Sequence, residues 1–216
     1  MSTRTTIVIV FVLLLASVLA GIILWNRLPD PMASHWGVND QVNGTMPKFW
    51  GVFLTPLISL GMFLLFLLIP AIDPLKANIA KFREAFNLFI AFMMLFLTYV
   101  YGLTLAWNLG FTQFNMSSLL APALGLLFIL MGLMIRKAKR NFFIGIRTPW
   151  TLSSDKVWDE THRVGSGLFI MSGIFALIGV FFGSITAFLF ILIPLMVSTT
   201  FLIIYSYFLY RAETKV

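Results

Sequence analysis

The side chains best suited to recognition or chemistry lie in one segment, residues 136–163, which combines positive charge with aromatic rings. Within it, Arg147-Thr148-Pro149-Trp150 follows a short apolar run. Proline disfavours helical backbone at the residue before it, so we expect Thr148 to be extended and Pro149 to block a helix. The resulting fixed turn would present Arg147 and Trp150 together, an arrangement typical of a recognition surface.

A second pair of candidate side chains follows on a predicted helix. Ser153 or Ser154 can cap a helix that starts near Asp155, whose negative charge is favourable at a helix N-terminus. Trp158 and His162 are four residues apart and therefore share one helix face. A histidine beside a tryptophan more often packs against it than acts in catalysis, so we expect no catalytic residue here.

The elements that must position these residues are membrane helices. Only 11% of the 216 residues are charged, whereas a soluble domain carries roughly 25%. Four stretches lack Asp, Glu, Lys, Arg and His, namely residues 5–26, 49–72, 85–135 and 164–210. Since one span needs about 20 apolar residues, the first two stretches fit one span each and the last two fit two each. The sequence therefore predicts an all-α membrane protein with six transmembrane helices.

Each of the two long uncharged stretches contains a turn signal that divides it into two spans. Gly183 and Ser184 form the second of these signals, and so short a connection predicts tightly packed antiparallel helices. The first signal is a cluster of polar and glycine residues, Asn108, Gly110, Thr112, Gln113, Asn115, Ser117 and Ser118.

The distribution of Lys and Arg predicts that both termini lie in the cytoplasm, because cytoplasmic loops of membrane proteins are enriched in these residues. With that orientation the outside keeps only Arg27 and Lys48. The start of the chain is similar to a secretory signal, but its apolar run has the length of a full span, so we expect an uncleaved anchor. The predicted cytoplasmic cations are Arg4, Lys76, Lys81, Arg83, Arg136, Lys137, Lys139, Arg140, Arg147, Lys156, Arg163, Arg211 and Lys215.

Three connecting segments have simpler interpretations. The predicted external loop, 26–48, is rich in Pro, Gly, Asn and Asp and is expected to consist of turns without a regular element. The segment 71–84, with a turn at Asp73-Pro74, is expected to be a short cytoplasmic loop that sets topology. The basic cluster at 136–140 is expected to anchor the chain to anionic lipid.

Enzyme chemistry and metal binding find no support in the sequence. The predicted spans contain no Asp, Glu, Lys, Arg or His, which disfavours ion-coupled transport and proton relays. His35 and His162 are predicted on opposite sides of the membrane and cannot share a metal, and cysteine is absent. We expect no enzyme activity, no cofactor and no metal. Asn87 and Asn108 either join helices by hydrogen bonds or line a polar path, so a transporter or lipid-interacting protein stays an alternative.

The residues of two segments resemble known families. The run from Asn141 to Arg163, Asn-Phe-Phe-Ile-Gly-Ile-Arg-Thr-Pro-Trp-Thr-Leu-Ser-Ser-Asp-Lys-Val-Trp-Asp-Glu-Thr-His-Arg, followed by Gly165 and Gly167, resembles the signature loop of the SdpI family of bacterial immunity proteins. The residues Leu28-Pro29-Asp30-Pro31, Ser34-His35-Trp36-Gly37, Asn43-Gly44 and Lys48 resemble an uncharacterised domain that often precedes it.

This resemblance implies a multi-pass plasma-membrane protein that protects its producer from a secreted toxic peptide. It further implies that a small winged-helix repressor is held at the membrane when toxin is present, with no direct contact to nucleic acid. The implied regions are a two-span region at 1–70 with the external loop 26–48, a cytoplasmic loop and third span at 71–116, and the SdpI-like region at 117–216.

The resemblance also nominates two sets of site residues. The expected sensing residues on the outside are Pro29, His35, Trp36, Gly37 and Lys48. The expected docking or signalling residues in the cytoplasmic loop are Gly145, Arg147, Thr148, Pro149, Trp150, Trp158, Thr161, His162 and Arg163.

Overall fold

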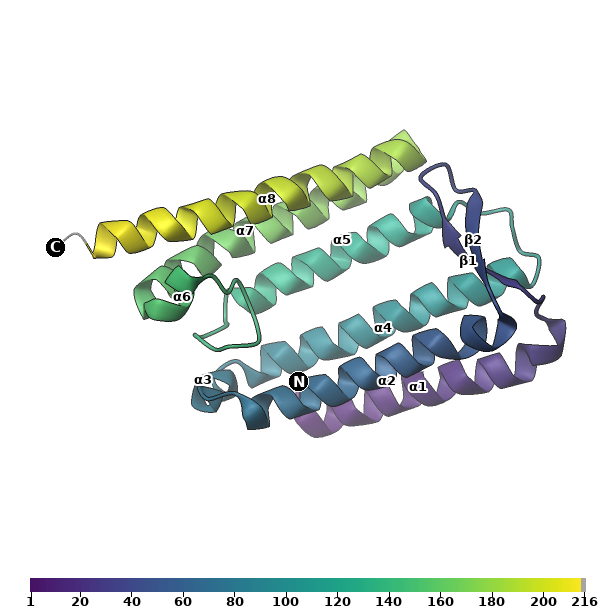
Figure 1. The fold of residues 1–216 in the computed structure, drawn as a ribbon, viewed down its shortest axis with the longest axis horizontal. Helices are drawn as coiled ribbons and strands as arrows, with labels where there is room; N and C mark the ends of the chain where they lie inside the picture. The colour runs from purple at the N-terminus through teal and green to yellow at the C-terminus, as the bar shows by residue number, and fades with distance from the viewer. Residues whose placement is uncertain (215–216) are drawn as a thin grey trace.

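A computed structural model describes residues 1–214, and six long helices account for most of this part of the chain (Figure 1). Lys215, one of the predicted cytoplasmic cations, lies outside the described residues. The long helices are α1 (Thr3–Leu24), α2 (Lys48–Ile72), α4 (Arg83–Asn108), α5 (Met116–Ile135), α7 (Asp155–Gly179) and α8 (Ser184–Glu213). The short elements are η1 (Trp25–Arg27), β1 (Met32–Trp36), β2 (Val42–Met46), α3 (Lys76–Ala80), α6 (Pro149–Ser153) and η2 (Val180–Phe182).

The prediction of six transmembrane helices is confirmed, because each long helix is long and apolar enough to cross a membrane. Both predicted breaks within the uncharged stretches are also present. Gly110 follows α4 with φ of 96°, and Gly183 separates η2 from α8 with φ of 89°. Glycine adopts such positive φ values at no steric cost, which explains why the chain turns at these two points.

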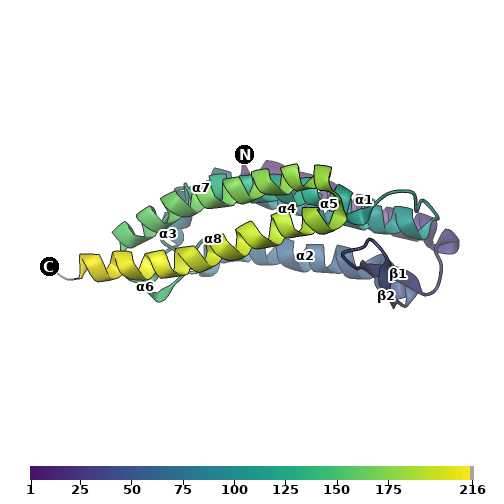
Figure 2. The same cartoon turned by 90° about the horizontal axis from the view of Figure 1, so that it is seen from above.

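The helices form two groups of three, and the groups meet mainly along α4 and α5 (Figure 1). One group comprises α1, α2 and α4, and the other comprises α5, α7 and α8. Seen from above, α2, α8 and the two strands lie in one layer, while α1, α4, α5 and α7 lie in the other (Figure 2). Both termini lie at the end of the bundle opposite the strands, and we call these ends the termini end and the hairpin end.

Small residues let α5 and α7 approach each other closely. The backbone carbonyl of Gly173 on α7 lies 2.8 Å from the position that a Cβ atom on Gly125 would occupy. A Cβ atom on Gly132 would lie 2.7 Å from the carbonyl oxygen of Ser166. Contacts of this kind are typical of membrane helices, where association depends on close packing and not on the exclusion of water.

The expectation that residues 26–48 carry no regular element is wrong. Strands β1 and β2 form an antiparallel hairpin in which Met32 pairs with Met46 and Trp36 pairs with Val42. The composition rich in turn-forming residues misled the prediction, because an isolated two-stranded hairpin is marginal in water. Here the hairpin is stabilised by contacts with helices that are distant in sequence.

The first of these contacts fixes β1 to the end of α4. The side-chain amide of Asn108 accepts a hydrogen bond from the backbone N–H of Ala33 at 2.8 Å and donates one to its carbonyl oxygen at 3.0 Å. The amide thus takes the place of a neighbouring strand at the outer edge of β1. Asn108 therefore joins a helix to the hairpin and is not free to line a polar path.

Two carboxylates of the same segment cap helix N-termini. Asp30 accepts a hydrogen bond from the backbone N–H of Lys48, the first residue of α2, at 3.1 Å. Asp40, at the turn between the strands, accepts from the backbone N–H of Ser117 on α5 at 2.7 Å and from the hydroxyl of Ser184 on α8. Negative charge is favourable at these helix ends, so the hairpin joins the two groups of helices.

We expect Asp40→Ala to lower the free energy of unfolding by about 0.5–2 kcal/mol, the usual effect of removing a helix cap. Thermal unfolding of the purified protein in detergent micelles measures this change. Asp40 has φ of 57°, a region that Asn tolerates better than Ala, so Asp40→Asn is the matched control. The control should recover part of the loss, because its amide oxygen can still accept from Ser117. Equal stability of Asp40→Ala and wild type would contradict the capping role.

Candidate functional site: a folded loop at the termini end

The segment 136–163 folds into a compact structure at the termini end, which we call the loop unit. Its first turn is organised by Asn141, whose side chain is fully buried. The amide oxygen accepts hydrogen bonds from the backbone N–H groups of Phe143 and Ile144, at 2.9 and 2.6 Å. The amide nitrogen donates to the carbonyl oxygens of Lys139 and Ile144. One side chain therefore replaces the backbone hydrogen bonds that a regular element would supply.

The centre of the loop unit is the stacked pair of Trp158 and His162 on α7. Their ring centroids are 4.0 Å apart, and both side chains are buried. The indole N–H donates to the carbonyl oxygen of Ala138 at 2.9 Å. The prediction that both residues share one helix face is confirmed, and Ser154 caps this helix by accepting from the backbone N–H of Val157.

The hydrogen bonds of His162 define its protonation pattern. Nδ1 lies 2.8 Å from the carbonyl oxygen of Trp158, and Nε2 accepts from the backbone N–H of Ile146 at 2.9 Å. A carbonyl oxygen can only accept and an amide N–H can only donate, so the ring carries its proton on Nδ1 and is neutral. His162 thereby positions the chain at Ile146, and its second nitrogen is occupied. This is the role of a structural histidine.

Backbone geometry explains why a glycine stands next to this histidine. Gly145 has φ of 114°, in the region that glycine adopts most readily. A Cβ atom at this position would collide with Nε2 of His162. Any side chain on residue 145 would therefore displace the imidazole from Ile146.

The expectation that Pro149 blocks a helix is wrong, because Pro149 is the first residue of α6. Proline is tolerated there because its missing N–H has no helical partner at the first position. Thr148 is extended as predicted and forms a capping box with Thr151. The hydroxyl of Thr148 also lies 3.0 Å from that of Ser206 on α8, which fixes α6 against the last helix.

The loop 71–84 is joined to the loop unit by hydrogen bonds. Asp73 is buried, and its carboxylate accepts from the backbone N–H of Leu75 at 2.6 Å and from that of Phe142 at 2.8 Å. The amide of Asn78, on α3, donates to the carbonyl oxygen of Arg140. These bonds join segments more than 60 residues apart, so the loop 71–84 has a structural role beyond setting topology.

Charged side chains surround the loop unit and face outward. Lys139 pairs with Asp159 at 3.0 Å, and Arg140 pairs with Asp155 at 2.7 Å. Exposed ion pairs of this kind contribute about 0–1 kcal/mol each. Arg147 is exposed and donates to the carbonyl oxygen of Phe142 at 2.8 Å. This bond closes the turn.

The predicted docking residues divide into a buried set and a surface set. Trp158, Thr161, His162 and Thr148 are buried and can act only through the shape of the loop unit. Arg147, Pro149 and Arg163 are exposed. Trp150 is half-buried with its ring centroid 5.2 Å from that of Tyr207, and Arg163 pairs with Glu160 on its own helix.

The predicted sensing residues lie at the opposite end of the molecule. His35 and Trp36 belong to β1, and Gly37 follows that strand. Pro29 is exposed beside the cap of α2, while the ammonium group of Lys48 lies 5.5 Å from the ring centroid of Trp25. The predicted sensing residues and the predicted docking residues therefore do not contact each other. Any communication between the two sets must pass through the helices.

Sequence reasoning missed Asn141, Asp73 and Thr151, which hold the loop unit together. Their signal was weak, because Asn and Asp before turns are common and their partners are far away in sequence. Thr151 donates its hydroxyl to the carbonyl oxygen of Ile146 at 2.8 Å and is fully buried.

A bundle of six membrane helices that carries a compact, basic and aromatic loop unit at one end defines the class: a multi-pass membrane protein. Residues 137–206 match the model of the SdpI/YfhL protein family, and residues 12–60 match a domain of unknown function, DUF1648. The match to the SdpI/YfhL family model covers nearly all of the loop unit, the rest of α7 and most of α8, and the DUF1648 match covers the hairpin and parts of α1 and α2.

A curated relative matches along almost its whole length. The chain is 27% identical over 196 residues to the "Immunity protein SdpI" of Bacillus subtilis (strain 168), covering 89% of this chain and 91% of the relative. No solved structure matches the chain. Together with the six apolar helices, this similarity identifies a multi-pass bacterial membrane protein.

Proposed function

We propose that this protein is a non-enzymatic immunity protein that protects its producer from a secreted toxic peptide. The observation that carries the proposal is the match to an immunity protein over nine-tenths of both chains, which includes the hairpin end as well as the loop unit. The buried histidine also supports a role without catalysis, because both of its ring nitrogens are occupied by structural hydrogen bonds.

We propose further that the termini end faces the cytoplasm. The loop unit, the loop 71–84 and the end of α8 lie at the termini end and hold all the predicted cytoplasmic cations among residues 1–214 except Arg4, which lies at the start of α1. Of the Lys and Arg residues within 1–214, only Arg27 and Lys48 lie at the hairpin end. The excess of Lys and Arg at one end favours this orientation, and it places the hairpin on the side where a secreted peptide arrives.

The finer part of the proposal concerns the cytoplasmic partner. A small repressor would dock on the surface set of the loop unit when toxin is present, and the buried set would hold that surface in shape. Arg147 and Trp150 offer a guanidinium and an indole from one short turn, and such side chains are enriched in the energetic centres of protein interfaces.

Deletion of the gene tests the immunity function. We expect the deletion strain to be killed by a secreted peptide that the parent survives, and expression of the full chain to restore survival. Equal survival of both strains across secreted peptides from the producer and its neighbours would contradict the proposal.

The repressor part is tested by Arg147→Ala, with Lys156→Ala as the control, since each removes one exposed positive charge from the same segment. At normal protein levels, we expect Arg147→Ala to lose immunity and to leave the repressor in the soluble fraction after toxin exposure. Lys156→Ala should behave as wild type. Retention of both functions by Arg147→Ala would refute the docking surface.

A transporter function has less support from the geometry. A wet cleft lined jointly by Asn87 and Asn108 would have favoured it, but these residues lie near opposite ends of α4. The amide of Asn87 donates to the hydroxyl of Thr3 at 3.0 Å, and that of Asn108 holds β1.

A further inference from the structure

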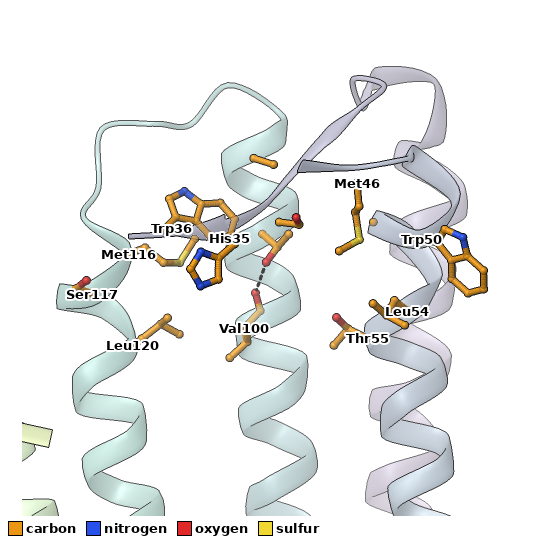
Figure 3. Close-up of a pocket in the computed structure, with 14 residues that line it drawn as sticks. His35, Trp36, Met46, Trp50, Leu54, Thr55, Val100, Met116, Ser117 and Leu120 are labelled. Carbon is orange, nitrogen blue, oxygen red and sulfur yellow. Dashed lines mark hydrogen bonds between the residues drawn. The ribbon is translucent and has the colours of Figure 1, made fainter. Parts of the chain in front are cut away.

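A cavity lies beneath the hairpin at the seam between the two groups of helices. It has a volume of about 340 Å³ and is bounded by α2, α4 and α5, with β1 as its roof. Figure 3 shows His35 and Trp36 at this roof, with Leu120 of α5 and Thr55 of α2 on the facing walls. Val100 and Thr104 of α4 form the floor.

A second cavity lies beside the first and is bounded by the hairpin, α5 and α8. Its volume is about 530 Å³, and it reaches Phe188 of α8. The two cavities share His35, Trp36, Ser117 and Leu120. They are therefore neighbours, and we call the two together the hairpin cleft, which extends from α2 to α8 across the only extensive junction between the helix groups among residues 1–214. Each part has the size of a typical ligand site.

The lining of the hairpin cleft differs from that of a lipid-facing groove. The cavity between α7 and α8 is lined by apolar side chains and by Ser172 and Ser198, whose hydroxyls are 3.3 Å apart and bonded to each other. The hairpin cleft instead holds an imidazole, His35, together with several hydroxyl groups, among apolar walls. Its lining includes no Asp, Glu, Lys or Arg.

This chemistry selects an uncharged ligand that carries both bulky apolar groups and hydrogen-bonding groups. A charged group would be costly here, since no opposite charge lines the cleft to compensate for lost hydration. A lipid acyl chain would offer no hydrogen bond to Nε2 of His35, although the hydroxyl of Thr104 is already bonded to the carbonyl oxygen of Val100 at 3.0 Å. A peptide segment satisfies both requirements, because its side chains fill the apolar walls while its amide groups bond to the polar ones.

We propose that the hairpin cleft binds an uncharged, apolar segment of the secreted peptide. This inference rests on the proposed immunity function and names the place where that peptide is recognised. His35 is held for this role by Asn43, whose amide oxygen lies 2.5 Å from Nδ1 of the imidazole, so Nε2 is the nitrogen left for a ligand. Leu120 lines both cavities and would contact the ligand in each.

Filling the cleft tests the proposal in living cells. Leu120→Trp places a large ring in both cavities, and Leu133→Trp makes the same change at an exposed, lipid-facing position of the same helix. We expect the peptide concentration that kills the cells to fall by about tenfold or more for Leu120→Trp, which corresponds to about 1.4 kcal/mol of lost binding. Leu133→Trp should match wild type, with membrane levels measured for both.

A second variant and a direct binding measurement cover the case in which Leu120→Trp fails to fold. Val100→Phe fills the cleft from α4 instead. The chain contains no cysteine, so Ser34→Cys on the cleft wall and Asn39→Cys on the exposed hairpin turn each introduce a single thiol. The purified toxic peptide that kills the deletion strain should slow maleimide labelling at residue 34 several-fold and leave residue 39 unchanged.

The outcomes distinguish a failure of the cleft proposal from a failure of the proposed immunity function. If the deletion strain is sensitive but both cleft-filling variants protect fully and residue 34 labels at the same rate with peptide, the cleft proposal is overturned while the immunity function stands. If labelling at residue 34 is already blocked in phosphatidylcholine vesicles without peptide, lipid occupies the cleft and the proposal is also overturned. A deletion strain as resistant as its parent would overturn both.

Discussion

Replacement of Trp158 by alanine is expected to lower the free energy of unfolding by about 3–5 kcal/mol, the usual cost of emptying the site of a buried tryptophan. The side chain is completely buried, so its removal leaves a cavity beneath the loop unit. His162 loses its stacking partner, and the carbonyl oxygen of Ala138 loses its donor. We therefore expect the loop unit to open even where the six helices persist.

Limited trypsin digestion measures this opening directly, because the loop unit contains Lys137, Lys139 and Arg140 close to the bond that Trp158 makes with residue 138. Cleavage at these sites should be much faster in Trp158→Ala than in wild type. Trp158→Phe is the matched control, since it keeps an aromatic ring against His162 and removes the hydrogen bond and part of the ring volume; the buried unpaired acceptor alone costs about 1–3 kcal/mol. Wild-type resistance to trypsin in Trp158→Ala would mean that the stacked pair does not hold the loop unit.

Gly173→Ala and Gly167→Ala are expected to change stability in opposite directions, although both place the same methyl group on α7. A Cβ atom on Gly173 collides with the backbone carbonyl of Gly125, and backbone cannot move aside as a side chain can. Overpacking of this kind costs about 1–3 kcal/mol, occasionally more. At Gly167 a Cβ atom meets nothing within 4 Å, so the better helix propensity of alanine should stabilise by up to about 1 kcal/mol.

Thermal unfolding of the two variants in the same detergent tests this difference. A lower midpoint for Gly173→Ala and an equal or higher midpoint for Gly167→Ala would support the close approach of α5 and α7. Because the loop unit includes the start of α7, we also expect Gly173→Ala to weaken immunity. Equal midpoints for the two variants would show that these helices can separate at little cost.

The membrane architecture could be predicted from the sequence because the signal is local. The gaps between charged residues defined the six spans, and glycine marked both turns within the long stretches. The capped start of α7 was also predictable, since Ser154 and Asp155 lie next to the helix they begin. None of these inferences required knowledge of contacts between distant residues.

The hairpin and the interior of the loop unit could not be predicted, because their stabilising contacts are long-range. The hairpin depends on Asn108 and on the helix ends that Asp40 caps. The loop unit depends on Asp73, which precedes Phe142 by 69 residues. Pro149 was misinterpreted because a proline can begin a helix as well as interrupt one, and only the cap formed by Thr148 and Thr151 distinguishes the two cases.

The position of Asp40 has a thermodynamic consequence for the proposed immunity function. Its carboxylate bonds to the first turns of α5 and α8, while β1 of the same hairpin is fixed to the last turn of α4. A ligand that displaces the hairpin would alter the arrangement of these helix ends. It can shift the equilibrium between two arrangements only by the difference between its binding free energies for them. Such coupling is reciprocal. A partner that stabilises one arrangement at the termini end would change the affinity of the hairpin cleft by the same factor, so occupancy at each end would report on the other.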